Sequence, residues 1–129
     1  MSHREAVMAP DAPAPAGPYS HAVRSGGLLF CSGQVPIDPA TGKLVEGAIG
    51  DQARQCLENL TTVCKQSGVT LADAVRMAIY VTDISTFAQV NEVYGSYFAA
   101  DPPARTTIGV AALPGGAQIE MDAIVAVAD

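Results

Sequence analysis

The sequence predicts an α+β fold in which two helices cover one face of a largely antiparallel sheet. Segments with strand and helix patterns follow one another as a hairpin, a helix, a strand, a second helix and two final strands. Each helical segment has a single apolar stripe, which is typical of a helix that covers a sheet. The 129 residues suit one domain, so we expect a single domain over residues 1–129.

The N-terminal part of the chain is rich in proline. Residues 1–18 contain four of the nine prolines, and we expect residues 1–16 to be an extended, poorly ordered or polyproline-II-like lead-in. A β-hairpin is predicted next, with strands at residues 20–24 and 28–32 on either side of a Ser-Gly-Gly turn. His21, near the start of this hairpin, is expected to be structural or to face solvent.

The first predicted helix begins at Asp51 and ends at Gly68. Asp51 favours a helix start through the helix dipole, and Gly68 supplies a C-terminal stop. Between them the apolar residues recur at the i, i+3, i+4, i+7 spacing of one helix face. They are Ala53, Cys56, Leu57, Leu60, Val63 and Cys64.

A strand at residues 74–81 and a second helix follow. β-Branched residues predict the strand. The helix is expected to begin at Asp83 or Ser85 and to end before the Pro-Pro pair at residues 102–103, because proline cannot continue it. Asn91 is a polar position on the apolar stripe of this helix. Its side chain is expected either to bond to a neighbouring backbone group or to face a pocket.

The last two predicted strands, residues 105–112 and 118–127, carry two isolated charges, Arg105 and Glu120. One interpretation is a structural ion pair or two solvent-facing positions. The other is a small carboxylate-binding site with a general acid/base beside it. A simple hairpin register places Arg105 opposite Ile124, roughly 13 Å along the strand from Glu120. A contact between the two would then need side-chain reach, a bulge, or contributions from different chains.

The composition favours an oligomer and disfavours nucleic-acid binding. Apolar residues make up 49% of the chain and charged residues only 16%. A small soluble monomer with this composition would have few charges on its surface. We therefore expect part of the surface to be covered by other subunits. The net charge is −6, and the seven Lys and Arg residues are scattered singly. No basic stripe is present that would attract a phosphate backbone.

The cysteines and the N-terminal sequence indicate the cellular compartment of the protein. Cys31, Cys56 and Cys64 have no metal-ligand spacing and are predicted to be buried free thiols, which suggests a reducing compartment. The N-terminus has no apolar run of signal-peptide length, and no stretch of the sequence is long and apolar enough to cross a bilayer. These features together predict a cytoplasmic protein.

Seven short motifs occur in order along the chain after the lead-in. They are Gly17-Pro18-Tyr19-Ser20, Ser32-Gly33-Gln34-Val35-Pro36, Asp38-Pro39-Ala40-Thr41-Gly42, Asn59-Leu60, Asn91-Glu92-Val93-Tyr94, Pro103-Ala104-Arg105 and Leu113-Pro114 through Ile119-Glu120. Together they resemble the RidA/YjgF family of reactive-intermediate (imine) deaminases. The resemblance implies a chorismate-mutase-like fold and a homotrimer, with the sheets packed together in the middle, the helices outside and active sites in clefts between subunits.

The resemblance also implies a reaction. The substrates would be 2-imino acids such as 2-iminopropanoate and 2-iminobutanoate, with their enamine tautomers such as 2-aminoacrylate, released by PLP-dependent dehydratases. Water would convert them to 2-keto acids and ammonia, with no metal or cofactor involved. Arg105 is the position of the family's substrate-binding arginine, and Glu120 is that of its water-activating carboxylate. The chemistry fits, because a guanidinium binds a carboxylate through two parallel hydrogen bonds and a carboxylate can relay protons.

Five further positions match substrate-binding positions of the family. Tyr19 follows the Gly-Pro pair, Ser32 and Gly33 begin the Ser-Gly-Gln motif, and Asn91 lies in the second helix. Family members often carry cysteine two residues after the arginine, and here that residue is Thr107. Thiol-dependent chemistry at this position is therefore in doubt, whereas hydrolysis should survive because the backbone N–H remains.

Two other functions are alternatives. Members of the family have been described as endoribonucleases or translation inhibitors, so an RNA-directed role is one of them. The acidic balance and the absence of a basic or aromatic platform count against it. The other is a non-catalytic trimer that binds small carboxylates, which would keep Arg105 but would not need Glu120.

Overall fold

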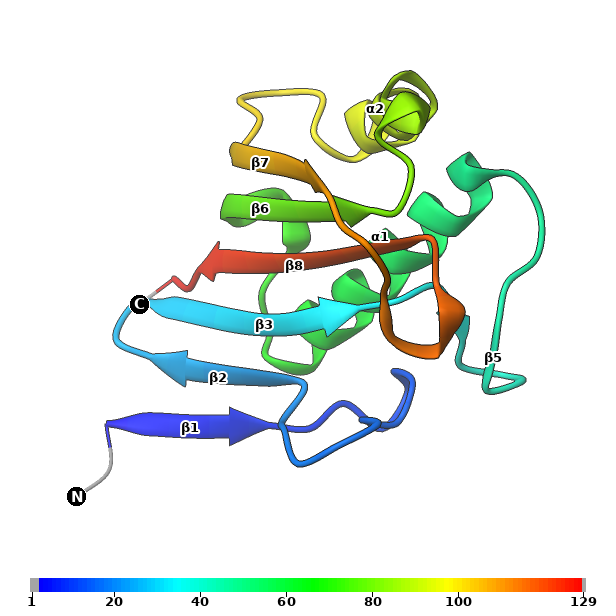
Figure 1. Cartoon of the computed structure of the whole chain (residues 1–129). Coiled ribbons are helices and arrows are strands. Elements are labelled where there is room, and N and C mark those ends of the chain that lie inside the picture. The colour runs from blue at the N-terminus through cyan, green and yellow to red at the C-terminus, as the bar shows by residue number, and fades with distance from the viewer. Residues whose placement is uncertain (1–2, 129) are drawn as a thin grey trace.

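The computed structural model describes residues 3–128, which form one sheet of six strands in the order β1-β2-β3-β8-β6-β7 (Figure 1). Every neighbouring pair is antiparallel except β6 and β7, which are parallel. The strands are β1 (Arg4–Val7), β2 (Ala22–Ser25), β3 (Leu28–Gln34), β6 (Ala74–Val81), β7 (Ala104–Gly109) and β8 (Ile119–Ala126). A separate two-stranded hairpin joins β4 (Ile37–Asp38) to β5 (Lys43–Leu44).

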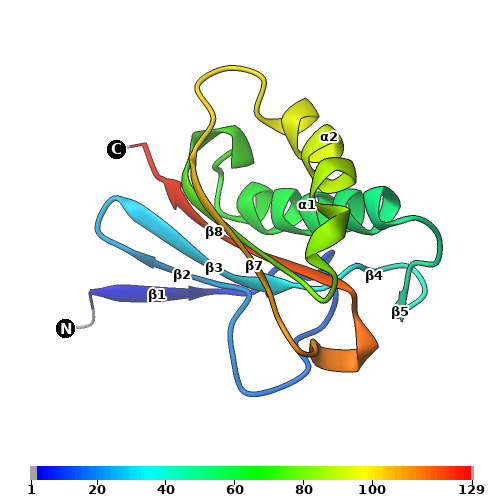
Figure 2. The same cartoon turned by 45° about the horizontal axis from the view of Figure 1, so that its top comes forward.

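Two α-helices among the described residues, α1 (Ile49–Gln66) and α2 (Phe87–Tyr97), cover one face of the sheet (Figures 1 and 2). The predicted fold class is therefore confirmed. Short 3-10 turns precede β6 (η1, Leu71–Asp73), α2 (η2, Ile84–Thr86) and β8 (η3, Pro114–Gly116). No helix within residues 3–128 combines the length and the apolar character needed to cross a membrane.

The core lies between α1 and the central strands β3, β8 and β6. Leu57 and Leu60, on the predicted apolar stripe of α1, are completely buried. They pack with side chains of the sheet that point toward the helices, such as Met77 of β6 and Met121 of β8, which are also completely buried. Along β8, buried and half-buried residues alternate strictly, because successive side chains of a strand point to opposite faces.

Most element boundaries lie close to the predicted ones. Strand β6 spans the predicted residues, and α1 begins two residues before Asp51. The second helix begins with η2, where the Asp83 side chain accepts a hydrogen bond from the backbone N–H of Ser85 at 3.0 Å. The α-helical turns start only at Phe87.

The predicted hairpin between the last two strands is wrong. Strand β7 pairs with β6 in parallel, and Arg105 lies beside Met77. Strand β8 lies between β3 and β6, where Ile124 pairs with Phe30 on one side and with Arg76 on the other. The physical reason is that β6, α2 and β7 form a crossover unit, which places β7 at the sheet edge. After β7 the chain crosses β6, and β8 lies between β3 and β6, where both edges of β8 are hydrogen-bonded.

The lead-in is more ordered than the sequence indicates. Residues Arg4–Val7 form the edge strand β1, and Ala9 and Ala12 are buried. The anchor for this segment is His21, which is buried. Its Nδ1 accepts from the backbone N–H of Ala9 at 2.8 Å, and its Nε2 donates to the backbone oxygen of Pro13 at 2.7 Å. The structural alternative predicted for His21 is thus the correct one. Met1 and Ser2 lie outside the described residues.

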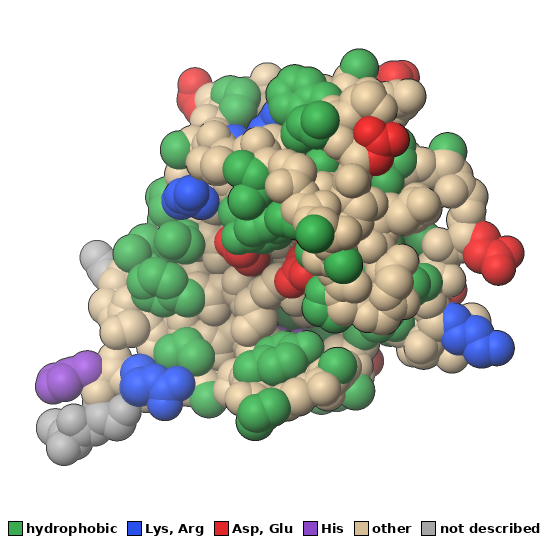
Figure 3. Space-filling view, in the orientation of Figure 1, with side chains coloured by type: hydrophobic (Ala, Val, Ile, Leu, Met, Phe, Trp, Pro, Cys, Tyr) green, Lys and Arg blue, Asp and Glu red, His purple; other side chains and the backbone are tan. Residues whose placement is uncertain are grey.

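The other face of the sheet carries no helix of residues 3–128 (Figures 1 and 2). Phe30 of β3 is 43% exposed and Ile108 of β7 is 44% exposed. In Figure 3, hydrophobic side chains gather on this face, and acidic side chains lie near its middle, over β8. We call it the open face. Exposed apolar side chains of this kind commonly mark a protein–protein contact.

Replacing His21 by Ala should destabilise the protein. The change removes both hydrogen bonds and leaves the Ala9 N–H and the Pro13 carbonyl without their partner, at a cost of about 1–3 kcal/mol in the free energy of unfolding. Urea denaturation followed by circular dichroism measures it. His3→Ala is the matched control, because the His3 side chain is exposed and the hydrogen bond from the Ser25 hydroxyl goes to the His3 backbone oxygen. Equal effects of the two substitutions would contradict the anchoring role.

Candidate active site

Glu120 lies on β8, half-buried, with its side chain on the open face. The β3–β8 pairing is irregular between Cys31 and Gln34, and Gly33 lies inside that irregularity. A Cβ added to Gly33 would collide with the Glu120 carboxylate and would lie 2.9 Å from its Cδ. The close approach of the carboxylate to the β3 backbone therefore requires glycine at this position.

A small cavity of about 70 Å³ adjoins this carboxylate, and its lining includes Tyr19, Gly33, Pro114 and Glu120. The Tyr19 hydroxyl accepts from the backbone N–H of Ala16 at 3.1 Å, so its own proton can still be donated. The cavity holds no more than a very small group.

The Ser32 hydroxyl is held by the loop that precedes β2. It donates its proton to the backbone oxygen of Ser20 at 2.7 Å. Toward any other group, the hydroxyl oxygen can therefore only accept a hydrogen bond. Ser32 directly precedes Gly33 on β3, but its side chain is not among those that line the cavity. We call Tyr19, Ser32, Gly33 and Glu120 the Glu120 group.

The surroundings of Glu120 favour its protonated form. Burial raises the pKa of the Glu120 carboxyl, and the negative charge of Asp122, two residues along the same face, raises it further. Asp122 accepts a hydrogen bond from the Tyr80 hydroxyl at 2.8 Å. That bond and burial raise the pKa of Tyr80, so the phenol stays protonated. Arg105 does not offset the shift of Glu120, because its side chain lies elsewhere.

Arg105 lies on β7 and projects toward α2. Its Cζ is 4.7 Å from the ring centroid of Tyr94 and 5.3 Å from that of Phe87, so the guanidinium is held by two aromatic faces. Such cation–π contacts position an arginine without using its N–H donors. The donors stay available to a planar anion such as a carboxylate.

Three buried polar atoms near Arg105 have no hydrogen-bond partner among residues 3–128: Oδ1 of Asn91, the hydroxyl of Tyr94 and Oγ1 of Thr107. Asn91 lies on α2 between the two aromatic residues, one turn from each, and Thr107 follows Arg105 on the same face of β7. Buried polar atoms normally have partners, so this arrangement indicates a place that a ligand or another chain completes. We call Phe87, Asn91, Tyr94, Arg105 and Thr107 the Arg105 group.

The two groups lie on opposite faces of the sheet. Arg105 is paired with Met77 on β6, which points into the core under the helices. Glu120 is paired with Tyr80, three residues later on β6. Residues three apart on a strand point to opposite faces, and paired residues share a face. The predicted site residues are therefore divided between two places, and Arg105 and Glu120 of one chain do not meet.

Three residues that shape these groups are not among the predicted site residues: Phe87, Tyr94 and Asp122. In the sequence, Phe87 and Tyr94 belong to the apolar stripe of the second helix, a pattern typical of core packing. The i, i+2 spacing of two carboxylates on a mostly apolar strand was the available signal for Asp122.

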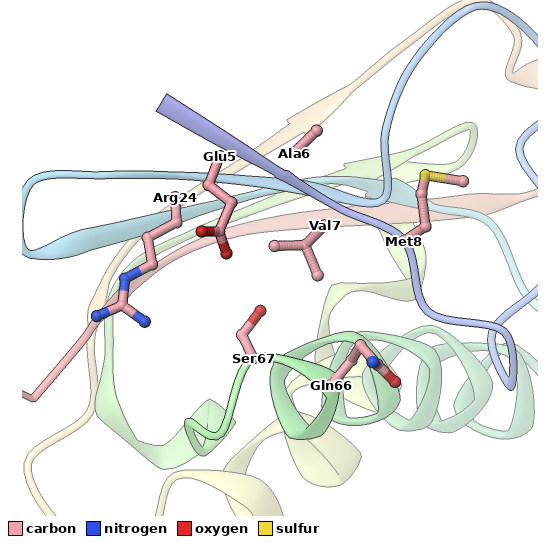
Figure 4. Close-up of a pocket in the computed structure, with 7 residues that line it drawn as sticks. All are labelled: Glu5, Ala6, Val7, Met8, Arg24, Gln66 and Ser67. Atoms are coloured by element: carbon pink, nitrogen blue, oxygen red, sulfur yellow. The ribbon is translucent and has the colours of Figure 1, made fainter. Parts of the chain in front are cut away.

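A separate pocket of about 340 Å³ lies between β1, β2 and the C-terminal end of α1 (Figure 4). Glu5, Arg24, Gln66 and Ser67 contribute polar side chains to it, and it includes no predicted site residue. Its opposite charges favour no single class of ligand. Within residues 3–128, no three His, Cys, Asp or Glu side chains come together in a way that could hold a metal ion.

Comparison with known proteins decides the family. Residues 9–127 match the family described as Endoribonuclease L-PSP. The chain belongs to this family, which is that of the RidA/YjgF proteins. The predicted resemblance is thus confirmed.

Relatives match over nearly the whole chain. A RutC family protein from Pyrococcus horikoshii is 44% identical over 94% of this chain and 96% of its own length. A protein named Reactive Intermediate Deaminase A, chloroplastic, from Arabidopsis thaliana is 42% identical over 94% of this chain and 65% of its own length. The crystal structure of RidA from a Psychrobacter species is 38% identical, with a TM-score of 0.91 over 95% of this chain and 99% of that one.

Replacing Gly33 by Ala should destabilise the protein through Glu120 alone. The three atoms nearest to the added methyl group all belong to the Glu120 side chain, whose end can move, so relieving the collision should cost about 1 kcal/mol of unfolding free energy. In a Glu120→Ala background the cost should fall to about 0.5 kcal/mol or less, because the colliding atoms are gone.

Gly27→Ala is the matched control for this double-mutant cycle. A Cβ at Gly27 meets no atom within 4 Å, so the substitution should change stability by no more than about 0.5 kcal/mol. Denaturant unfolding of the four proteins of the cycle and of the control gives the comparison. Equal costs of Gly33→Ala in both backgrounds would mean that the Glu120 carboxylate does not pack against Gly33.

Proposed function

We propose that this protein hydrolyses 2-imino acids, such as 2-iminobutanoate and 2-iminopropanoate, to 2-keto acids and ammonia. Membership in the RidA/YjgF family and the relative named as a reactive intermediate deaminase support the reaction class. The observation that carries the proposal is the chemistry of the two groups. One presents a guanidinium beside buried polar atoms that have no partner among residues 3–128, and the other presents a carboxylate with a raised pKa beside a small cavity.

The complete site is proposed to form between subunits of a homotrimer. Arg105 and Glu120 of one chain face opposite sides of the sheet, so a site that contains both takes them from different chains. A contact between two different surfaces of identical chains closes into a ring when its rotation permits. The exposed apolar residues of the open face supply the area that such an assembly would bury.

Substrate binding is assigned to the Arg105 group. The guanidinium would hold the carboxylate of the imino acid through two parallel N–H···O bonds, each contributing on the order of 1.5–3 kcal/mol. Asn91 and Thr107 would supply further polar contacts, since Asn91 Oδ1 and Thr107 Oγ1 have no partner among residues 3–128. Tyr94 and Phe87 keep the guanidinium in place. The substrate is thereby fixed in one orientation against the neighbouring subunit.

Proton transfer is assigned to Glu120 of that neighbouring subunit. In this scheme the carboxylate removes a proton from water as the water oxygen forms a bond to the imine carbon. The same carboxyl then gives this proton to the nitrogen of the carbinolamine. As the C–N bond breaks and ammonia leaves, the freed carboxylate takes the remaining hydroxyl proton, and the C=O bond of the 2-keto acid forms. A raised pKa suits both roles, because the group must accept and return a proton near neutral pH. Such catalysis typically contributes about 10²–10⁴-fold.

The RNA-directed alternative is favoured by one observation, the description of the matching family as an endoribonuclease. The net charge of −6 opposes it, since RNA binding draws on positive charge. Cleavage of a single-stranded RNA, measured with wild type and Glu120→Gln, would test it directly. A non-catalytic carboxylate binder would tolerate Glu120→Gln without loss of ligand affinity and would show no hydrolysis.

Mixing two inactive variants tests the proposal and its geometry. Arg105→Ala and Glu120→Gln should each slow keto-acid release by about 10²-fold or more when a dehydratase supplies 2-iminobutanoate. When the two variants are co-expressed with different tags and the mixed trimers are isolated, about a third of the sites should regain both groups. Arg24→Ala mixed with Glu5→Gln is the control, because both residues line the separate pocket of Figure 4. Full inactivity of the mixed Arg105/Glu120 oligomers would exclude a site shared between chains.

Asp122→Asn should move the pH dependence of kcat/KM. The base form of Glu120 is needed, so activity falls as the pH drops through its raised pKa. Removing the Asp122 charge lowers that pKa, and the acid limb of the profile should shift to lower pH. Tyr80→Phe is the control, since it removes the hydrogen bond to Asp122 but keeps the charge. A shift to higher pH, or an equal shift in both variants, would contradict the assignment of Glu120 as the base.

A further inference from the structure

An apolar groove of about 390 Å³ adjoins the small cavity of the Glu120 group. It lies between the β4–β5 hairpin and the turn η3 (Figure 1). Its walls include Ala16, Val35, Ile37, Leu44 and Pro114. Gly42, Lys43 and Gly115 complete the lining.

The groove and the cavity adjoin each other. Ala16, Val35, Ile37 and Pro114 line both of them. A molecule whose reacting carbon lies beside Glu120 would therefore extend along these residues. The cavity of about 70 Å³ accommodates only the reacting centre, whereas the groove is several times larger and apolar.

The floor of the groove is held by buried contacts. Ile37 of β4 pairs with Leu44 of β5. The Asn59 side chain, only 1% exposed on α1, donates to the backbone oxygen of Ile37 at 2.9 Å and to that of Val35 at 3.4 Å. These bonds tie the groove to the principal helix. A site that is formed before the ligand arrives loses less free energy on binding.

We propose that this groove binds the side chain of the substrate and that the preferred substrates are 2-imino acids with apolar side chains of about four or more carbons. The inference rests on the proposed function and adds a substrate class to it. A three-carbon imino acid leaves the groove filled with water. A branched or aromatic side chain replaces that water with contacts to Ile37, Leu44 and Pro114. The binding free energy gained from these contacts persists in the transition state, so kcat/KM rises.

Competition kinetics test the preference. An L-amino-acid oxidase generates the imino acids in the presence of catalase, and semicarbazide traps whatever the protein does not hydrolyse. We expect kcat/KM for 2-imino-4-methylpentanoate and 2-imino-3-phenylpropanoate to exceed that for 2-iminopropanoate by about tenfold or more. Equal or lower values for the larger substrates would overturn the inference and leave the proposed function intact.

Leu44 lines the groove but not the cavity, so a substitution at this residue changes the groove alone. Leu44→Trp fills the groove with the indole ring. The ratio of kcat/KM for 2-imino-4-methylpentanoate to kcat/KM for 2-iminopropanoate should then fall to about twofold or less. Lys65→Trp adds the same ring to the exposed side of α1 and should keep the wild-type ratio. A ratio that Leu44→Trp leaves unchanged would place the side chain of the substrate elsewhere.

Binding of the keto-acid products tests the groove independently of catalysis. We expect 4-methyl-2-oxopentanoate to bind with a Kd about tenfold lower than pyruvate and to shift the methyl resonances of Ile37 and Leu44. Loss of hydrolysis for every substrate, together with this binding pattern, would refute the proposed deaminase reaction but support the groove. Equal affinities without methyl shifts would refute the groove.

Discussion

The position of β8 in the sheet is the constraint on which the rest of the structure depends. Its backbone is hydrogen-bonded to β3 on one side and to β6 on the other. Its inward side chains Ile119, Met121 and Val125 are completely buried under the helices. Because side chains alternate along a strand, the same packing turns Glu120 and Asp122 onto the open face. A slip of one residue would bury both carboxylates and expose the core.

The polar groups of the candidate site lie where they lower the stability of an isolated chain. Glu120 is half-buried beside a second carboxylate, and its ionised form is disfavoured. On the other face, Asn91, Tyr94 and Thr107 each leave a buried polar atom without a partner among residues 3–128. Unsatisfied groups of this kind lower the stability of an isolated chain. They are consistent with two surfaces that complete each other, because a ligand and a second chain would satisfy both.

The sequence predicted the elements well and their order in the sheet poorly. The apolar stripe of α1 and the β-branched run of β6 are local patterns, and each appears in the structure close to the predicted bounds. The hairpin predicted for the last strands was wrong, because adjacent strands in sequence need not pair. The lead-in is predicted to be extended, poorly ordered or polyproline-II-like, because nothing local indicates that His21 anchors it from twelve residues away.

For the candidate site, the sequence by itself determined the chemical groups. It singled out Arg105 and Glu120, because isolated charges in apolar strands and ordered motifs are visible in one dimension. Only the tertiary structure decided where these groups lie: Arg105 between two aromatic rings of α2, and Glu120 against Gly33 on the opposite face. The physical reason is that the face of a strand residue follows from pairing with distant strands. Local sequence carries no direct record of that pairing.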